Sequence, residues 1–283
     1  MTTSKLAGRR VIRMNGAGNK ILVLDLRGGL SLPTPEQARA IHLAPGLNYD
    51  QMMVLTDPHT PGTLAYVPIY NNDGSLAGAC GNGTRCVADR LARETGLNHL
   101  MIETTRGLIA CERLGESEYR VDMGAPRLTA AEIPFAGEGE TVAANIPGAE
   151  AFGPAGLVNM GNPHAVFFVP DFAAVDLAKL GPPLETHPLF PEKANISFAQ
   201  ILGPGRIKLK VWERGVGATL ACGSAACATL VAAVRRGLSP REATVELPGG
   251  ALFMGWREAD DHVLMTGPVE FEREIELTAS MFA

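Results

Sequence analysis

Short hydrophobic runs along the chain predict buried strands. ILVLD follows Gly18-Asn19 closely, and AVFFV follows Gly161-Asn162 in the same way. Both runs are apolar and rich in β-branched or aromatic residues, which favour strands. In each case the polar Gly-Asn pair lies just before the strand.

Two longer segments predict helices, one over about residues 82–95 and one over 224–236. Each is followed by a glycine, Gly96 or Gly237, at the position where helices commonly stop. The second helix, SAACATLVAAV, is apolar on nearly every face and must be buried all round. A sheet wrapped around a central helix satisfies that requirement.

These features recur at about half the chain length. Gly161 lies 143 residues after Gly18, and Cys222 lies 142 residues after Cys80. The pair Tyr70-Asn71 recurs as Trp212-Glu213, and Gln51 has a rough counterpart in Asn195, 144 residues later. Coincidental glycine-rich turns are the alternative, but four features in one order favour two homologous halves.

The predicted fold class is therefore α+β, with two pseudo-symmetric half-domains, each a mostly antiparallel sheet around a central helix. We expect residues 1–123 plus 268–283 to form the first half and 124–267 the second. Pro-rich stretches at about 126–154 and 181–191, and the PGG turn at 248–250, are expected to be connections.

Composition narrows the class of protein. The 283 residues carry 25 Lys plus Arg against 30 Asp plus Glu, a net charge of -5, which gives no electrostatic footprint for nucleic acid. No apolar stretch is long enough for a membrane span, and the first residues do not form a signal peptide. We expect a cytoplasmic protein with a small-molecule partner and no nucleic-acid or membrane partner.

Cys80 and Cys222 stand at equivalent places, each directly before a predicted helix start. The positive end of the helix dipole and its unpaired N–H groups should lower the pKa of both thiols. The same N–H groups, at Gly81-Asn82 and Gly223-Ser224, can hold a carboxylate, and Asn82 and Ser224 suit the N-cap position.

Two such thiols suit one reaction. If the halves face each other about a pseudo-twofold axis, one thiolate can remove a proton from an α-carbon while the opposite thiol delivers one to the other face. Convergent helix N–H groups would stabilise the carbanion. The expected product is an inverted stereocentre.

Other roles for the cysteines are less well supported. Five cysteines is an odd number for a disulfide framework, and the spacings from Cys80 to Cys86 and from Cys222 to Cys227 do not match zinc knuckles. We expect no metal site, and we expect Cys86, Cys111 and Cys227 to be core thiols.

No cofactor is expected either. The chain has no GxxxxGK[ST] phosphate loop and no obvious pyridoxal lysine, although Lys20 stays open as a candidate. A cofactor-independent mechanism is the simpler interpretation.

Three further residues are candidates on position alone. His164 lies in one of the repeated polar clusters, where a structural role is equally open. Glu213-Arg214 lies shortly before Cys222, so Arg214 can clamp a carboxylate and Glu213 can receive an ammonium group. A solvated ion pair is the alternative for this dipeptide.

The motifs resemble those of the diaminopimelate epimerase family. YNNDGSLAGACGNGTRC resembles the first cysteine motif of the family and ERGVGATLACGSAAC resembles the second; NMGNPH, the PGG turn and MTGP are also similar. The resemblance runs from about Met14 to Pro268. It implies pyridoxal-independent interconversion of LL- and meso-diaminopimelate, on the route to lysine and peptidoglycan, by a homodimer.

The resemblance also implies roles for individual residues. Cys80 and Cys222 would be the acid and base, and Gly81, Asn82, Gly223 and Ser224 would hold the reacting carboxylate. His164 and Glu213 would tune the pKa values of the thiols, and Arg214 would bind the distal carboxylate. The substrate pocket would be lined by Asn19, Gln51, Asn71, Asn162, Asn195, Glu213 and Arg214.

The chain departs from the family pattern at a few positions. The usual MHGxGNDF is MNGAGNKI here, so Asn15, Lys20 and Ile21 replace His, Asp and Phe. Ser224-Ala225 replaces Thr-Gly, and Asn72 replaces Ala. These changes bear on substrate fit near Asn19 and leave the reaction type unchanged. A racemase of another amino acid, a phenazine-type isomerase and a non-catalytic amino-acid-binding module are the alternatives.

Overall fold

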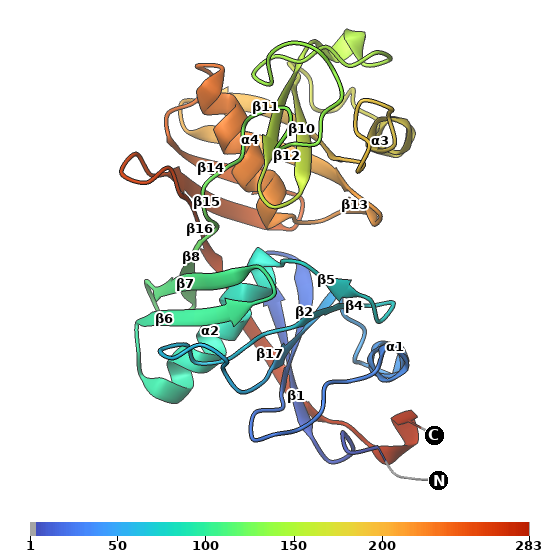
Figure 1. Cartoon of the computed structure of the whole chain (residues 1–283), viewed down its shortest axis with the longest axis vertical. Coiled ribbons are helices and arrows are strands. Elements are labelled where there is room, and N and C mark those ends of the chain that lie inside the picture. Colours follow the sequence, from blue (N-terminus) through green and yellow to red (C-terminus); the bar gives the residue numbers. More distant parts are fainter. Residues whose placement is uncertain (1–3, 283) are drawn as a thin grey trace. The chain divides into compact units, whose positions relative to one another are not determined.

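The described chain, residues 4–282 of this computed structural model, forms two units. Unit 1 consists of the residues up to Val121 together with those from Gly267 onward, and unit 2 is Asp122–Thr266. Each unit combines sheets with two α-helices (Figure 1). The predicted α+β class is therefore confirmed. No helix among residues 4–282 is long and apolar enough to cross a membrane.

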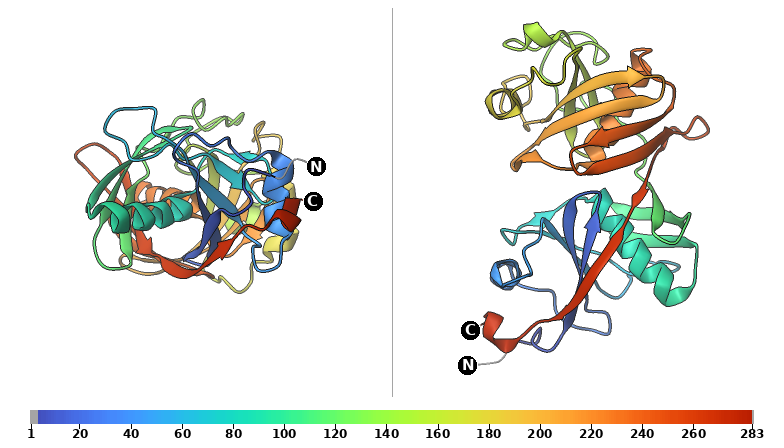
Figure 2. Two further views of the ribbon diagram at one scale, coloured as in Figure 1. Left: turned by 90° about the horizontal axis from the view of Figure 1, so that it is seen from below. Right: turned by 180° about the vertical axis from the view of Figure 1, so that it is seen from behind.

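The larger sheet of unit 1 has the strand order β17-β1-β2-β3-β4-β5. The last strand of the chain runs antiparallel beside the first, which Figure 2 shows as a red strand next to a dark blue one. A separate meander of β6, β7 and β8 follows the helix α2. The strands are β1 (Arg10–Gly16), β2 (Asn19–Asp25), β3 (Gln51–Leu55), β4 (Ile69–Asn71), β5 (Leu76–Ala77), β6 (His99–Thr104), β7 (Gly107–Arg113), β8 (Glu118–Asp122) and β17 (Glu270–Glu276).

Helix α2 (Gly81–Thr95) is the central helix of unit 1 and packs against β1, β2, β3, β6 and β7. Its C-cap is Gly96, whose φ of 73° is readily adopted only without a side chain. The second helix, α1 (Pro35–Leu43), starts with a capping box between Thr34 and Gln37 and buries Ala38 and Ile41 in a core cluster with β1, β2 and β3. A short 3-10 helix, η2 (Ala279–Phe282), lies beside it.

Unit 2 has the strand order β16-β15-β14-β12-β11-β10-β9, with β13 paired to β12. Its central helix α4 (Gly223–Arg235) is buried along nearly its whole length, as its apolar sequence predicts, and Gly237 follows it with φ 68°. The other helices are α3 (Leu177–Glu185) and the 3-10 helix η1 (Glu150–Phe152). The strands are β9 (Ala155–Asn159), β10 (Pro163–Phe168), β11 (Asn195–Gly203), β12 (Arg206–Glu213), β13 (Gly217–Thr219), β14 (Glu242–Leu247), β15 (Gly250–Trp256) and β16 (Val263–Pro268).

The strand registers confirm the internal repeat. In unit 1, β2 runs parallel to β3, and Gln51 lies opposite Asn71 of β4. In unit 2, β10 runs parallel to β11, and Ile196 of β11 lies opposite Trp212 of β12, which places Asn195 beside Glu213 in the same pattern. The structural counterparts therefore match the offsets in the sequence.

The sequence did not predict all elements. Two parallel strands need a crossover between them, and α1 and α3 fill these crossovers in the two units. Helix α3 extends into a stretch expected to be a connection, even though it contains Pro182 and Pro183. The Asp176 carboxylate caps its start, and both prolines are exposed.

Candidate functional site

The first candidate thiol, Cys80, is itself the N-cap of helix α2. Its Sγ accepts a hydrogen bond from the Gly83 N–H at 3.2 Å, and its carbonyl accepts from Thr84. The expectation that Asn82 caps this helix is therefore wrong, because the helix begins one residue earlier, at Gly81. The sulfur therefore accepts from a first-turn N–H group that has no partner within the helix.

Cys80 also contacts the end of the sheet. Its thiol donates to Oε1 of Gln51 at 3.4 Å, and Gln51 lies opposite Asn71 at the start of β3. The Asn71 amide in turn donates to Ser75 Oγ at 3.0 Å. Three of the predicted site residues of unit 1 therefore lie together at one sheet end.

The amide of Asn82 joins the same region from the helix. Its Nδ2 donates to Oδ1 of Asn19, and Asn19 donates to the Asp50 carboxylate. Asp50 also accepts from the backbone N–H of Lys20 at 2.8 Å. Asn82 is 2% exposed, and its Oδ1 has no hydrogen-bond partner among the described residues. A buried acceptor of this kind is available to a ligand that donates.

Gly16 explains how the helix start can lie so close to β1. A Cβ at Gly16 would come within 3.0 Å of the Asn82 carbonyl oxygen. The neighbouring turn is held by Asn15, whose Oδ1 accepts from the Gly18 N–H at 2.8 Å. Asn15, which departs from the family pattern, therefore has a local structural role.

The second candidate thiol, Cys222, is the N-cap of α4 and is only 6% exposed. The expectation that Ser224 caps this helix is wrong, because the helix begins at Gly223 and Ser224 lies inside its first turn. Ser224 Oγ lies 3.5 Å from the Cys222 Sγ. The pKa of this thiol is raised well above its usual value, first by burial and then by the charge of Glu213. The prediction of a lowered pKa is wrong for Cys222, because these two effects outweigh the helix end.

Glu213 contacts the thiol from the end of β12. It accepts a hydrogen bond from Cys222, and Thr219 Oγ1 donates to its Oε1 at 2.5 Å. Its neighbour Arg214 donates its backbone N–H to Asn195 Oδ1 at 3.0 Å and its guanidinium to the Glu192 carbonyl at 2.9 Å. Both the backbone and the guanidinium of Arg214 are therefore held by hydrogen bonds.

His164 lies fully buried in β10, beside Asn195 of β11. Its Nε2 lies 2.9 Å from Asn162 Oδ1, which places the ring proton on Nε2 because an amide oxygen only accepts. Burial, with a smaller effect from the charge of Arg214, lowers the pKa of His164 to about 3. The ring is neutral at physiological pH.

The predicted site residues therefore gather into one cluster in each unit. Sequence analysis missed Asp50 and Thr219, which hold Asn19 and Glu213. Asp50 directly precedes Gln51, but nothing in the sequence pairs Thr219 with a carboxylate. Cys86, Cys111 and Cys227 are buried, which confirms them as core thiols. Among residues 4–282, no three His, Cys, Asp or Glu side chains are grouped as metal ligands.

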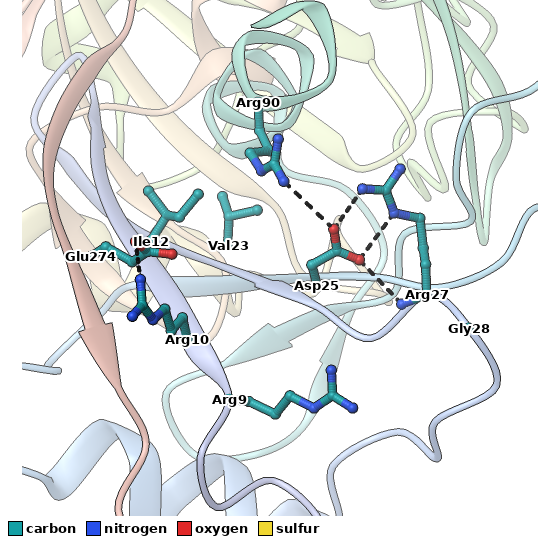
Figure 3. A pocket seen from close by; sticks show the side chains of 9 residues that line it. All are labelled: Arg9, Arg10, Ile12, Val23, Asp25, Arg27, Gly28, Arg90 and Glu274. Carbon is teal, nitrogen blue, oxygen red and sulfur yellow. Dashed lines mark hydrogen bonds and ion pairs between the residues drawn. The ribbon is translucent and has the colours of Figure 1, made fainter. Parts of the chain in front are cut away.

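A cavity of about 590 Å³ in unit 1 lies apart from these residues (Figure 3). Asp25 accepts from Arg27 and lies 4.0 Å from Arg90, while Arg10 pairs with Glu274. Burial opposes ionisation of Asp25, but hydrogen bonds and charge from Arg27 outweigh it and lower the pKa. The lining carries four arginines against two carboxylates, so the cavity has an excess of positive charge. It is lined by Arg9, Arg10, Ile12, Val23, Asp25, Arg27, Gly28, Arg90 and Glu274.

Solved structures with the same fold include a hydroxyproline epimerase from Agrobacterium vitis, with a TM-score of 0.70, 14% identity and coverage of 98% of this chain and 94% of that one. A protein from Pseudomonas aeruginosa described as a predicted epimerase has a TM-score of 0.69 at 19% identity, over 95% of this chain and 99% of that one. At these identities the likeness concerns the fold.

Sequence comparisons identify much more similar proteins. The chain is 55% identical to the diaminopimelate epimerase of Methylocella silvestris over 98% of both chains. It is 51% identical to that of a Methylobacterium species over 99% of both. The model of the family described as diaminopimelate epimerase matches residues 11–129 and 156–272. The chain belongs to the diaminopimelate epimerase family.

Proposed function

We propose that this chain is an isomerase that interconverts LL- and meso-diaminopimelate with two cysteines and no cofactor. The observation that carries the proposal is the equivalent placement of Cys80 and Cys222, each as the N-cap of a buried central helix. Family membership supports diaminopimelate as the substrate.

The reaction is a balanced exchange of protons. One sulfur, as a thiolate, accepts the α-proton and becomes a thiol, while the other, as a thiol, gives its proton to the opposite face and becomes a thiolate. The N–H groups of Gly81, Asn82, Gly223 and Ser224 hold the reacting carboxylate and stabilise the charge that develops on it. This step exchanges the protonation states of the two sulfurs, so the protein is then ready for the reverse reaction. Loss of a proton to solvent by one sulfur and uptake of a proton by the other reset the pair for another forward turnover.

The remaining site residues bind the two amino-acid ends of the substrate. Arg214 takes the distal carboxylate, and Glu213 takes an ammonium group. Because Glu213 raises the pKa of Cys222 in the substrate-free protein, an ammonium cation beside this carboxylate favours ionisation of the thiol. His164, neutral at physiological pH, tunes a thiol as a hydrogen-bonding group rather than as a cation. The other pocket residues are Asn19, Gln51, Asn71, Asn162 and Asn195.

Proton exchange in heavy water tests the proposal. LL-diaminopimelate incubated with the protein should gain α-deuterium and form the meso isomer, and Cys80→Ala and Cys222→Ala should each abolish epimerisation. Cys86→Ala and Cys227→Ala remove a buried thiol from the same two helices and serve as matched controls that retain activity.

Other outcomes would point to the alternatives. Binding of diaminopimelate without exchange would leave an amino-acid-binding module. Exchange with proline or lysine, but not with diaminopimelate, would keep the mechanism and change the substrate. Activity that survives in either of the two site variants would contradict the two-cysteine mechanism.

We further propose that the protein works as a homodimer in the cytoplasm, on the route to lysine and peptidoglycan. The net charge of -5 and the absence of a basic run support a small-molecule partner rather than nucleic acid or a membrane surface. Light scattering coupled to size-exclusion chromatography tests the dimer, since a mass near 29.9 kDa would contradict it.

A further inference from the structure

Glu185, the last residue of α3, contacts both ends of the segment that carries Glu213 and Arg214. Its Oε2 accepts from the Trp212 indole N–H at 2.7 Å, and its Oε1 accepts from the Gly215 backbone N–H at 2.9 Å. The carboxylate therefore spans the dipeptide, with one hydrogen bond before it and one after it. Glu185 is only 7% exposed, so both hydrogen bonds are shielded from water.

The packing of Trp212 against α3 strengthens this clamp. Helix α3 contacts both β12 and β13, as its position in Figure 1 indicates. Gly181, one turn before Glu185, lies directly against the indole, because a Cβ there would come within 2.4 Å of the ring. The indole is thus held between a glycine and a carboxylate of the same helix.

Glu185 occupies a place that is unfavourable for a structural carboxylate. It lies at the C-terminal, negative end of a helix, where cations are preferred, and burial of a carboxylate carries a desolvation penalty. The nearest cation, the Lys193 ammonium, is 3.9 Å away, and its side chain is 55% exposed. A neutral glutamine could pack there without these penalties, but it would offer one accepting oxygen where Glu185 uses two, one for each donor.

We propose that Glu185 is a positioning residue for the reaction: its carboxylate fixes the segment from Trp212 to Gly215, and thereby places Glu213 against Cys222 and Arg214 for its carboxylate ligand. The inference rests on the proposed function. Glu185 acts through the segment, since its carboxylate contacts Trp212 and Gly215 and lies 3.9 Å from Lys193. A small displacement of a substrate-positioning group is sufficient to slow an enzyme by about 10- to 100-fold.

Glu185→Gln tests the proposal, with Lys193→Met as the matched control. The glutamine keeps the shape but turns an amide N–H toward one of the two donors. We expect kcat/KM for diaminopimelate to fall about 10- to 100-fold, with a raised KM because Arg214 shifts. Lys193→Met removes the distant charge and leaves both hydrogen bonds, so its kinetics should match the parent.

A second readout does not depend on turnover. Alkylation of Cys222 by iodoacetamide, followed by mass spectrometry across a pH series, reports on the ionisation of this thiol. Displacement of Glu213 in Glu185→Gln should shift the profile toward lower pH. Trp212→Phe, which removes one of the two donors, should give a smaller effect, and the double variant should be less than additive.

The proposal would be overturned if Glu185→Gln kept the kinetics and the alkylation profile of the parent and only its melting temperature fell. Glu185 would then be a structural residue. An equal effect of Lys193→Met would also overturn it. If the parent protein does not act on diaminopimelate, the proposed function fails, and the alkylation profiles still decide whether Glu185 places Glu213 against Cys222.

Discussion

Acidification should weaken unit 2 through His164. The imidazole is fully buried, and burial lowers its pKa from the ordinary 6.5 to about 3. Between these two values the unfolded chain binds a proton that the folded chain does not. Stability contributed by neutral His164 is therefore present above pH 6.5 and is lost as the pH falls toward 3.

The two pKa values set the size of the effect. At pH 5 the unfolded imidazole is almost fully protonated while the folded one is not, so linkage predicts a loss of about 2 kcal/mol between pH 7 and pH 5. His164→Gln retains a donor for Asn162 Oδ1 but cannot titrate. The variant is expected to be less stable than the parent at pH 7 and to lose about 2 kcal/mol less on acidification.

Tryptophan fluorescence in urea measures this difference. The chain has two tryptophans, Trp212 and Trp256, and both lie in unit 2 with His164. Carboxylates that titrate in the same range are common to parent and variant, so their contribution cancels in the difference. Equal losses of unfolding free energy in the two proteins would refute the reasoning, since His164 would then be hydrated or already charged in the folded state.

Three further predictions concern unit 1. Thr34→Ala removes the capping box of α1 and should lower the unfolding free energy by about 1 kcal/mol in thermal unfolding followed by circular dichroism, whereas Thr34→Ser should not. Gly83→Ala would place a Cβ 2.5 Å from Met53 Sδ, so it should destabilise by about 1–3 kcal/mol. Adding Met53→Ala should give less than the sum of the two losses, and strict additivity would contradict the contact. The pKa of Asp25 is lowered in the folded protein, because the interactions with Arg27 outweigh burial. The contribution of Asp25 to folding stability is therefore present above the unfolded-state pKa of 3.8 and is lost as the pH falls below it. Asp25→Asn should reduce the unfolding free energy at pH 7 and make it fall less steeply at acid pH, as measured by urea unfolding. An unchanged acid dependence would count against the ion pair.

The sequence predicted the parts of the fold that local signals determine. Helices α2 and α4 are continuous segments with C-caps at Gly96 and Arg236, the latter followed by Gly237. Helix stops of this kind are encoded in a few neighbouring residues. The repeat was visible because polar clusters recur at sheet ends and helix starts. These same places supply the candidate site residues.

The sequence could not predict what depends on the fold as a whole. Helix α3 contains two prolines, and it forms because the parallel pairing of β10 and β11 requires a crossover and because its inner face packs on β12. The prediction of a lowered pKa for Cys222 was wrong for the same reason. The helix end is a local feature, but burial and the approach of Glu213 from β12 are tertiary.

The environment of Cys222 has a consequence for oxidation. Peroxides attack thiolates rather than thiols, and this sulfur is buried and kept protonated by a neighbouring carboxylate. In the resting protein it is therefore a poor target for air or peroxide. Once a ligand favours its ionisation, the same sulfur becomes oxidisable, so damage at Cys222 should accumulate with the number of turnovers rather than with the time in storage.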